Sequence, residues 1–310
     1  MANLARIDEL NDILEKDPTD FKARRELAVE FLLNGFNEEA LKQLYYLLKR
    51  FPEDSRLHYN AGIVLENLKK FDSAIVSYQR ALEISPDEPD FLYNLGYAYL
   101  QMNELDKAEP FFIRVLQLEE EDANCFFNLG FIYSKKENHE YAIQCLTAAV
   151  EANPNDHIAY FYLAYEHDKI GNRELAIDLY NKVLELSPDY SWACFNLASI
   201  YYEIGDYEKT KFYLQKTLEL NPKDNKAAVV FAKILVQEKK YNESIELLKN
   251  ILLENPYDGD THYTIAQIYK EVGNVGMYIT HLQEAVSNED TLSIPSELVQ
   301  NEVDIAQQQG

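Results

Sequence analysis

Cysteine is scarce in this sequence. The chain contains only three, Cys125, Cys145 and Cys194, and no two of them form a Cys-x-x-Cys pair. An odd number without paired spacing argues against a disulfide framework and against a structural zinc site. We therefore expect all three to be small, buried, apolar side chains.

Long apolar segments are also missing. A membrane-spanning helix needs about 18 or more consecutive apolar residues, whereas the best candidate here, Ala227 to Val236, is short and is interrupted by Lys233. The first residues, MANLARIDELNDILEKD, contain no apolar core of a signal peptide. The sequence therefore predicts a cytoplasmic protein that does not associate with membranes.

Basic residues are in the minority. The sequence has 29 lysines and arginines against 53 aspartates and glutamates, which gives a formal net charge of −24 at pH 7. Nucleic-acid backbones and anionic membrane surfaces attract proteins mainly through lysine and arginine. The composition therefore argues against nucleic acid and membrane as partners.

Motifs of common active sites do not occur. The sequence has no Walker or Gly-x-Gly-x-x-Gly loop and no His-Glu-x-x-His motif. The acidic run at 119–122 is typical of a solvated linker rather than of a cation site. We expect no catalytic residue, no metal and no cofactor, and we expect the six histidines to be core or surface residues. The histidines are His58, His139, His157, His167, His262 and His281.

A period of 34 residues organises the chain instead. Seven of the ten prolines follow it, with Glu120 at the one skipped position: Pro18, Pro52, Pro86, Pro154, Pro188, Pro222 and Pro256. Fixed repeats of this length indicate stacked supersecondary units.

Two rows of small residues share the same period. The first row is Ala28, Gly62, Gly96, Gly130, Ala164, Ala198, Ala232 and Ala266, and the second is Ala40, Ala74, Ala108, Ala142, Ala176, Thr210 and Ser244. Helices can approach closely only where both surfaces lack bulk. Larger apolar residues flank these rows at helical spacing, as on the buried stripe of a helix. Each unit is therefore predicted to be a helix, a tight turn and a second helix.

These marks resemble the tetratricopeptide repeat (TPR) family, for example at Gly62, Ala74, Tyr78, Ala81 and Pro86. The resemblance implies an all-α, right-handed superhelical solenoid of antiparallel helix pairs, in which the first helices line a concave groove. It implies an N-terminal capping helix at 1–20 and a C-terminal capping helix or tail at 293–310. Eight repeats would lie between them, at 21–54, 55–88, 89–122, 123–156, 157–190, 191–224, 225–258 and 259–292. The departures from the pattern are Glu120, Tyr278 and Asp290.

Groove-facing positions follow from this register. They carry an aromatic wall and, beside it, a column of asparagines whose amides can both donate to and accept from a peptide backbone. The wall consists of Tyr59, Tyr93, Phe127, Phe161, Phe195 and Tyr263, with Ile63, Tyr97, Phe131 and Tyr165 four residues later; the column consists of Asn60, Asn94, Asn128 and Asn196. The column resembles the asparagine ladder of O-GlcNAc transferases. Asparagine is also common at this position in TPRs, and the rings could instead pack against neighbouring helices.

The expected ligand of this groove is apolar with net positive charge. Residues 89–122 contain two basic and eight acidic residues, which favours cationic or neutral ligands. The carboxylate clamp by which some TPR domains hold acidic chaperone tails is disfavoured, because only Arg25 and Asn60 fit it and Asp90 reverses a charge. The other positions that correspond to the clamp are Val29 and Asn94.

Three functions compete at this point. The favoured one is a non-catalytic interaction scaffold that binds an extended or helical segment of a partner protein. The alternative is a structural element that self-associates by end-to-end stacking. A peptide-sensing transcriptional regulator is disfavoured, because residues 1–20 are too short and too acidic for a helix-turn-helix domain.

Overall fold

The computed structural model describes residues 4–309. In this range the protein is all-α, as the sequence predicts, with one 3₁₀ turn and no β-strand. The elements are α1 (Leu4–Lys16), α2 (Phe21–Leu33), α3 (Asn37–Arg50), α4 (Ser55–Asn67), α5 (Phe71–Ile84), α6 (Pro89–Gln101), α7 (Leu105–Leu118), α8 (Ala123–Lys135), α9 (His139–Ala152), α10 (His157–Lys169), α11 (Arg173–Leu186), α12 (Ser191–Glu203), α13 (Tyr207–Leu220), α14 (Asn225–Gln237), α15 (Tyr241–Glu254), α16 (Gly259–Glu271), α17 (Val275–Ser287), η1 (Glu289–Thr291) and α18 (Ser296–Gln309).

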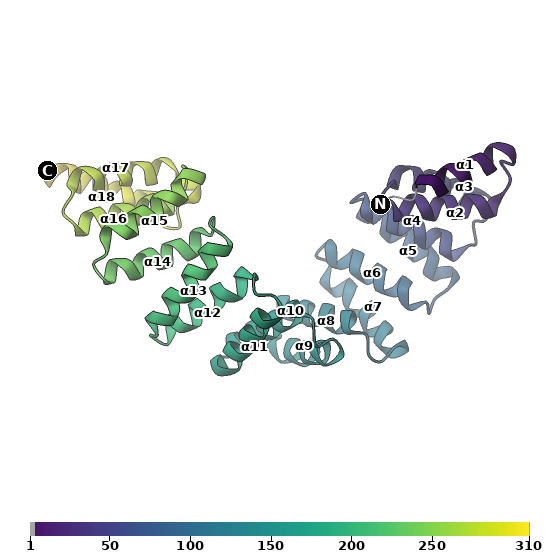
Figure 1. The fold of residues 1–310 in the computed structure, drawn as a ribbon, viewed down its shortest axis with the longest axis horizontal. Helices are drawn as coiled ribbons and strands as arrows, with labels where there is room; N and C mark the ends of the chain where they lie inside the picture. The colour runs from purple at the N-terminus through teal and green to yellow at the C-terminus, as the bar shows by residue number, and fades with distance from the viewer. Residues whose placement is uncertain (1–3, 310) are drawn as a thin grey trace. The chain divides into compact units, whose positions relative to one another are not determined.

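The helices form two compact units, one ending at Pro154 and one beginning at Asn155. The first contains α1 to α9 and the second contains α10 to α18 (Figure 1). Within each unit every helix packs on the next in chain order, so that a pair such as α4 and α5 is followed by contact between α5 and α6. Each unit is thus a solenoid of helix pairs.

An aspartate caps the N-terminus of the first helix in most of the helix pairs. The side chain of each accepts a hydrogen bond from the backbone N–H three residues later, which satisfies a donor that the helix itself cannot use. These caps are Asp20, Asp54, Asp122, Asp156, Asp224 and Asp258. Pro110 lies inside α7, which continues from Leu105 to Leu118.

The turn inside each pair contains one residue with positive φ. Glycine fills this position in four turns, where it adopts the left-handed conformation without steric cost. The glycines are Gly35, Gly171, Gly205 and Gly273, and the non-glycine residues are Lys69, Asn103, Glu137 and Lys239. The turn geometry is therefore the same in all eight pairs although the residue differs.

The small residues lie where the two helices of a pair cross. A Cβ added at Gly62 would lie 2.4 Å from the Cε1 atom of Tyr78, and one added at Gly130 would lie 2.6 Å from the Cγ atom of Leu146. Tyr78 and Leu146 are both fully buried. The close helix crossing that the small-residue rows predict is therefore confirmed.

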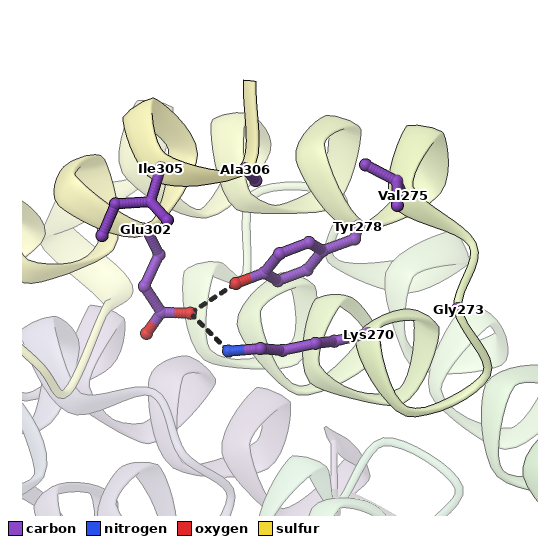
Figure 2. A pocket seen from close by; sticks show the side chains of 7 residues that line it. All are labelled: Lys270, Gly273, Val275, Tyr278, Glu302, Ile305 and Ala306. Atoms are coloured by element: carbon purple, nitrogen blue, oxygen red, sulfur yellow. Dashed lines mark hydrogen bonds and ion pairs between the residues drawn. The ribbon is translucent and has the colours of Figure 1, made fainter. Parts of the chain in front are cut away.

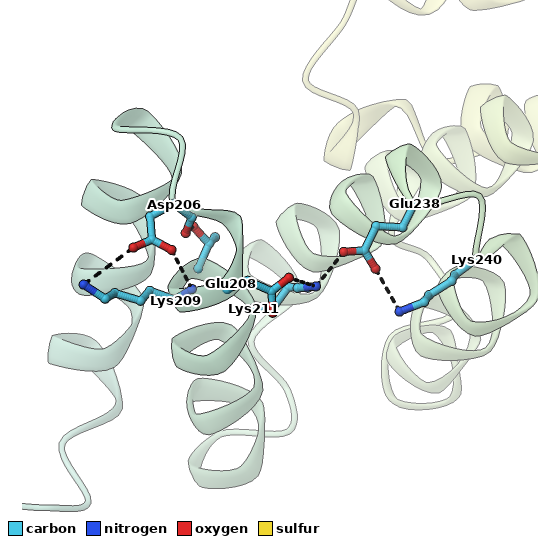
Figure 3. A network of polar contacts seen from close by, with 7 residues as sticks. Asp206, Glu208, Lys209, Lys211, Glu238 and Lys240 are labelled. Atoms are coloured by element: carbon cyan, nitrogen blue, oxygen red, sulfur yellow. Dashed lines mark hydrogen bonds and ion pairs between the residues drawn. The ribbon is translucent and has the colours of Figure 1, made fainter.

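Charged side chains link consecutive repeats. In the first unit Arg80 contacts Glu53 at 2.6 Å and Arg114 contacts Asp87 at 2.7 Å, two pairs with the same spacing in sequence. In the second unit Lys211 of α13 contacts Glu238 at the end of α14 (Figure 3). Exposed ion pairs contribute about 0–1 kcal/mol each, so they support the stacking without dominating it.

We predict that Gly62→Ala lowers the free energy of unfolding by about 1–3 kcal/mol, because the new methyl group overlaps the buried ring of Tyr78. The matched control is Gly276→Ala in α17, where the nearest atom to an added Cβ is 3.9 Å away. That variant should be neutral or more stable by up to about 1 kcal/mol, since alanine is the better helix former. Urea unfolding followed by far-UV circular dichroism measures both. Equal midpoints for Gly62→Ala and the parent would contradict the close crossing.

Candidate functional site

The predicted groove positions of the first unit lie on α4, α6 and α8. Their side chains are half-buried, except Asn128, which is 4% exposed. Ile63 packs against the core of the first repeats, and Phe131 lies under the Lys135 ammonium at 5.3 Å from the ring centroid. Asn60 and Phe127 are likewise half-buried. The wall is therefore a set of partly covered rings rather than a freely exposed strip.

Two asparagines of the column are hydrogen-bonded to groove tyrosines. The amide nitrogen Nδ2 of Asn94 donates to the Tyr59 hydroxyl at 2.7 Å, and Nδ2 of Asn128 donates to the Tyr93 hydroxyl at 3.1 Å. Each bond joins one first helix to the next, from α6 to α4 and from α8 to α6. An amide has two N–H groups and a carbonyl oxygen, so one further N–H and the oxygen remain for other contacts.

The tyrosine rings in these pairs are held by packing. Tyr59 stacks on Phe91 with 4.5 Å between ring centroids, and Tyr93 lies nearly parallel to Tyr97 at 6.3 Å and edge-on to Phe112 at 5.6 Å. Burial, with the nearby charge of Asp90, raises the pKa of Tyr59 to about 12. Burial also raises the pKa of Tyr93. Both hydroxyls therefore stay protonated near neutral pH and can donate a hydrogen bond of their own.

The groove positions of the second unit are held differently. Phe161 packs edge-on to Tyr190 at 5.3 Å, and Tyr165 lies under the Lys169 ammonium at 5.0 Å from the ring centroid. Phe195 packs against the buried cluster around Ala198. These rings are half-buried, like those of the first unit.

The tyrosine–asparagine pairing ends at the second unit. Asn196 donates instead to the backbone oxygen of Trp192, within its own helix, at 2.7 Å. Tyr162 stands where α10 would need an asparagine, and Phe161 has no hydroxyl to accept from α12. The sequence differences explain why the pairs stop.

Two exposed apolar residues beside the groove positions are not among the residues predicted from the sequence. Ile158 and Trp192 occupy the second residue of α10 and α12 and are 40% and 60% exposed. They precede Phe161 and Phe195 by three residues, which places them on nearly the same helix face. An exposed tryptophan is a frequent anchor in protein interfaces. The available signal was that Trp192 is the single tryptophan of the chain.

The C-terminal segment folds as α18 and is bonded to the last repeat through Glu302. Its carboxylate accepts hydrogen bonds from Tyr263 and Gln267, each at 3.0 Å. It also accepts one from Tyr278 at 2.8 Å, and Lys270 lies 3.9 Å away (Figure 2). Burial alone would raise the pKa of Glu302, but these hydrogen bonds together lower it. Tyr278, which replaces a small residue of the repeat pattern, is therefore explained by its contact with α18.

A hollow of about 380 Å³ lies beside this carboxylate (Figure 2). Val275, Ile305 and Ala306 form its apolar wall, and Lys270 and Glu302 form its polar part. The Glu302 carboxylate already accepts three hydrogen bonds from the last repeat. We therefore regard the hollow as part of the contact surface between α18 and the last helix pair.

Two histidines meet inside the last repeat. The Nδ1 atoms of His262 and His281 are 3.0 Å apart, and Nε2 of His262 lies 3.1 Å from the carbonyl oxygen of Pro256. Since Nε2–H of His262 donates to that oxygen, its Nδ1 accepts the proton of His281 Nδ1. Burial, His262 and Lys249 lower the pKa of His281 to about 4. This pair is a hydrogen-bonded contact between α16 and α17.

Residues 4–309 contain neither a cluster of metal-binding side chains nor a membrane-spanning helix. No group of three or more histidine, cysteine or acidic side chains gathers there in a way that could hold a metal ion. No helix in the same range is long and apolar enough to span a bilayer.

We predict that the second unit loses stability between about pH 6.5 and pH 4, because His281 stays neutral in the fold while the unfolded chain takes up a proton. His281→Gln keeps a donor to His262 and should flatten this pH dependence. The control is His58→Gln, since His58 contacts Pro52 in the same way at 2.8 Å but has no histidine partner. Calorimetric melting temperatures over this pH range test the idea, and a parallel decline in parent and His281→Gln would refute it.

A second prediction concerns α18. Glu302→Ala removes the acceptor of three hydrogen bonds and should destabilise the seating of α18 by about 1–3 kcal/mol. Amide hydrogen exchange should then accelerate in α18 and remain unchanged in α1 to α9. Asp304→Ala, an exposed acid on the same helix, is the matched control. Unchanged exchange in Glu302→Ala would show that apolar packing alone holds α18.

Comparison with known proteins agrees with a repeat solenoid of helix pairs. Family models described as TPR repeat match residues 67–103, and models described as tetratricopeptide repeat match 1–60, 89–122 and 127–191. The chain belongs to the tetratricopeptide repeat family. A model of the anaphase-promoting complex, cyclosome, subunit 3 matches residues 169–251.

Solved structures share this fold. YrrB, described as a TPR protein with an unusual peptide-binding site, is 24% identical with a TM-score of 0.52, over 59% of this chain and 94% of its own. MamA from Desulfovibrio magneticus RS-1 is 24% identical with a TM-score of 0.53, over 56% and 97%. A chain of the APC/C hetero-tetramer Cut9-Hcn1 is 19% identical with a TM-score of 0.55, over 97% and 58%. No curated protein matches the sequence.

Proposed function

We propose that this chain is a non-catalytic scaffold that binds an extended or helical segment of a partner protein along the groove positions of its first helices. The observation that carries the proposal is the pairing of Asn94 with Tyr59 and of Asn128 with Tyr93. The pairing holds each amide in one orientation; one N–H and the oxygen of the half-buried Asn94 stay available for a peptide backbone, while the buried Asn128 fixes the Tyr93 hydroxyl. The peptide-binding site named for YrrB, which has the same fold, supports this reading.

The proposed partner segment has apolar anchors and net positive charge. Half-buried rings such as Tyr97 and Phe131 supply apolar contact, and the faces of aromatic rings attract lysine and arginine. The excess of 53 acidic over 29 basic residues adds a long-range attraction for cations that salt weakens.

End-to-end self-association is the weaker alternative. At the C-terminal end α18 covers the last pair, and its residues Val299, Val303 and Ala306 are buried against Tyr278 and Leu282. Stacking at that end would require α18 to dissociate from the last helix pair. Light scattering over a range of concentrations separates the two functions, since stacking grows with concentration and groove binding does not.

We predict that Tyr97→Ala with Phe131→Ala weakens partner binding by more than about 2 kcal/mol, as the loss of aromatic anchors often does. Asn94→Ala with Asn128→Ala should weaken it by about 1 kcal/mol per lost hydrogen bond. The measurement is affinity purification with mass spectrometry to identify the partner, followed by titration calorimetry with its binding segment.

The matched control is Val76→Ala with Ile113→Ala, two exposed apolar residues on the second helices α5 and α7. Far-UV circular dichroism confirms that each variant keeps its helices. A partner retained equally by all three double variants binds outside the groove and contradicts the proposal.

A further inference from the structure

The first repeat contains a hollow of about 500 Å³ between α2 and α3. Three cations line it, Arg24, Lys42 and Lys49, together with the aromatic rings of Tyr45 and Tyr46. Its one lining carboxylate, Glu38, lies 3.9 Å from Lys70 of the next repeat. The lining is therefore positive in a protein whose formal net charge is −24.

The two lysines of the hollow have no carboxylate partner among the described residues. Elsewhere several lysines and arginines contact a carboxylate of a neighbouring repeat, as Arg80, Arg114 and Lys211 do. Lys42 and Lys49 are exposed and form no ion pair with any residue that the structure describes. Neither ammonium group is therefore held by a carboxylate contact within the described part of the chain.

Arg24 is fixed in place beside them. One terminal nitrogen donates to Gln43 Oε1 at 2.6 Å, the other donates to the carbonyl oxygen of Pro18 at 3.0 Å, and the guanidinium lies over the ring of Tyr46 at 4.0 Å. None of these partners is a carboxylate. The guanidinium is therefore oriented without being neutralised.

The Nε–H group of Arg24 adds an independent observation. It is buried and has no acceptor, and such side-chain atoms are rare among the described residues, with Tyr180 Oη and Thr261 Oγ1 as the other two cases. A buried donor without a partner costs free energy, and the guanidinium of Arg24 therefore keeps a hydrogen-bonding capacity that the described side chains do not use. Anionic oxygens are the acceptors that a guanidinium binds best.

We propose that this hollow is a second binding site, which takes an acidic segment of a partner protein. Lys42 and Lys49 are seven residues apart on one helix, or about 10 Å along its axis. A single small anion cannot contact both, whereas a segment with several carboxylates can. Tyr45 and Tyr46, 46% and 45% exposed, offer apolar contact beside the cations. This site lies outside the groove positions and selects the opposite charge.

The test uses the full chain and a fluorescein-labelled synthetic peptide of alternating glutamate and glycine with one central phenylalanine. We expect Lys42→Glu with Lys49→Glu to weaken binding at least about tenfold, because two attractive contacts become repulsive. The matched control is Lys226→Glu with Lys233→Glu, which are also exposed, seven residues apart on one helix and identical in charge change. It should weaken binding less than about threefold, through screened long-range repulsion alone.

Further binding measurements identify which chemical groups of the ligand the hollow recognises. The same peptide with glutamine in place of glutamate should bind at least about tenfold more weakly, since the carboxylates supply the attraction. Equal binding of the two peptides, or equal loss in both double variants, would overturn the proposal. Inorganic phosphate that occupies the hollow as tightly as the peptide would show a small-anion site and would also overturn it. Groove variants such as Tyr97→Ala with Phe131→Ala should leave this binding unchanged, so the two sites fail or succeed separately.

Discussion

The close crossing of the two helices in each pair is the constraint on which the rest of the structure depends. At Gly62 and Gly130 the facing side chains come nearer than any Cβ would allow. This contact fixes the distance and angle between the helices of a pair, and the next first helix then packs on the second helix. The spacing between Tyr59 and Asn94, and between Tyr93 and Asn128, follows from that geometry.

The tyrosines at the predicted groove positions have a structural role and, in the proposed function, a recognition role as well. Their rings are held by Phe91, Tyr97 and Phe112, so few rotamers have to be lost when a ligand arrives. Half-burial limits the apolar area that the free protein shows to water, which keeps a ring-lined surface compatible with solubility. The Tyr59 hydroxyl and the Asn94 amide are polar groups within this half-buried layer.

Much of the fold could be predicted from the sequence, because the 34-residue period, the small rows and the prolines report local geometry that repeats. The groove positions followed from the same register. The tyrosine–asparagine bonds could not be predicted, since a ring reaches the next helix only in one rotamer and at one helix spacing. The pairing of His262 with His281 and the orientation of Arg24 could not be predicted for the same reason. Each depends on two side chains from different helices, and none of these residues is unusual in the sequence by itself.

The turns inside the helix pairs have a consequence for how such repeats are detected. Lys69, Asn103, Glu137 and Lys239 adopt the left-handed conformation that the other four turns assign to glycine. For a non-glycine residue that conformation costs about 1 kcal/mol, which the packing of the flanking helices can absorb. The residue therefore varies among the eight turns of this chain while the backbone conformation stays the same. A search pattern that required glycine in the turn would miss half of these repeats, whereas one built on the small residues of the helix crossing would find nearly all of them.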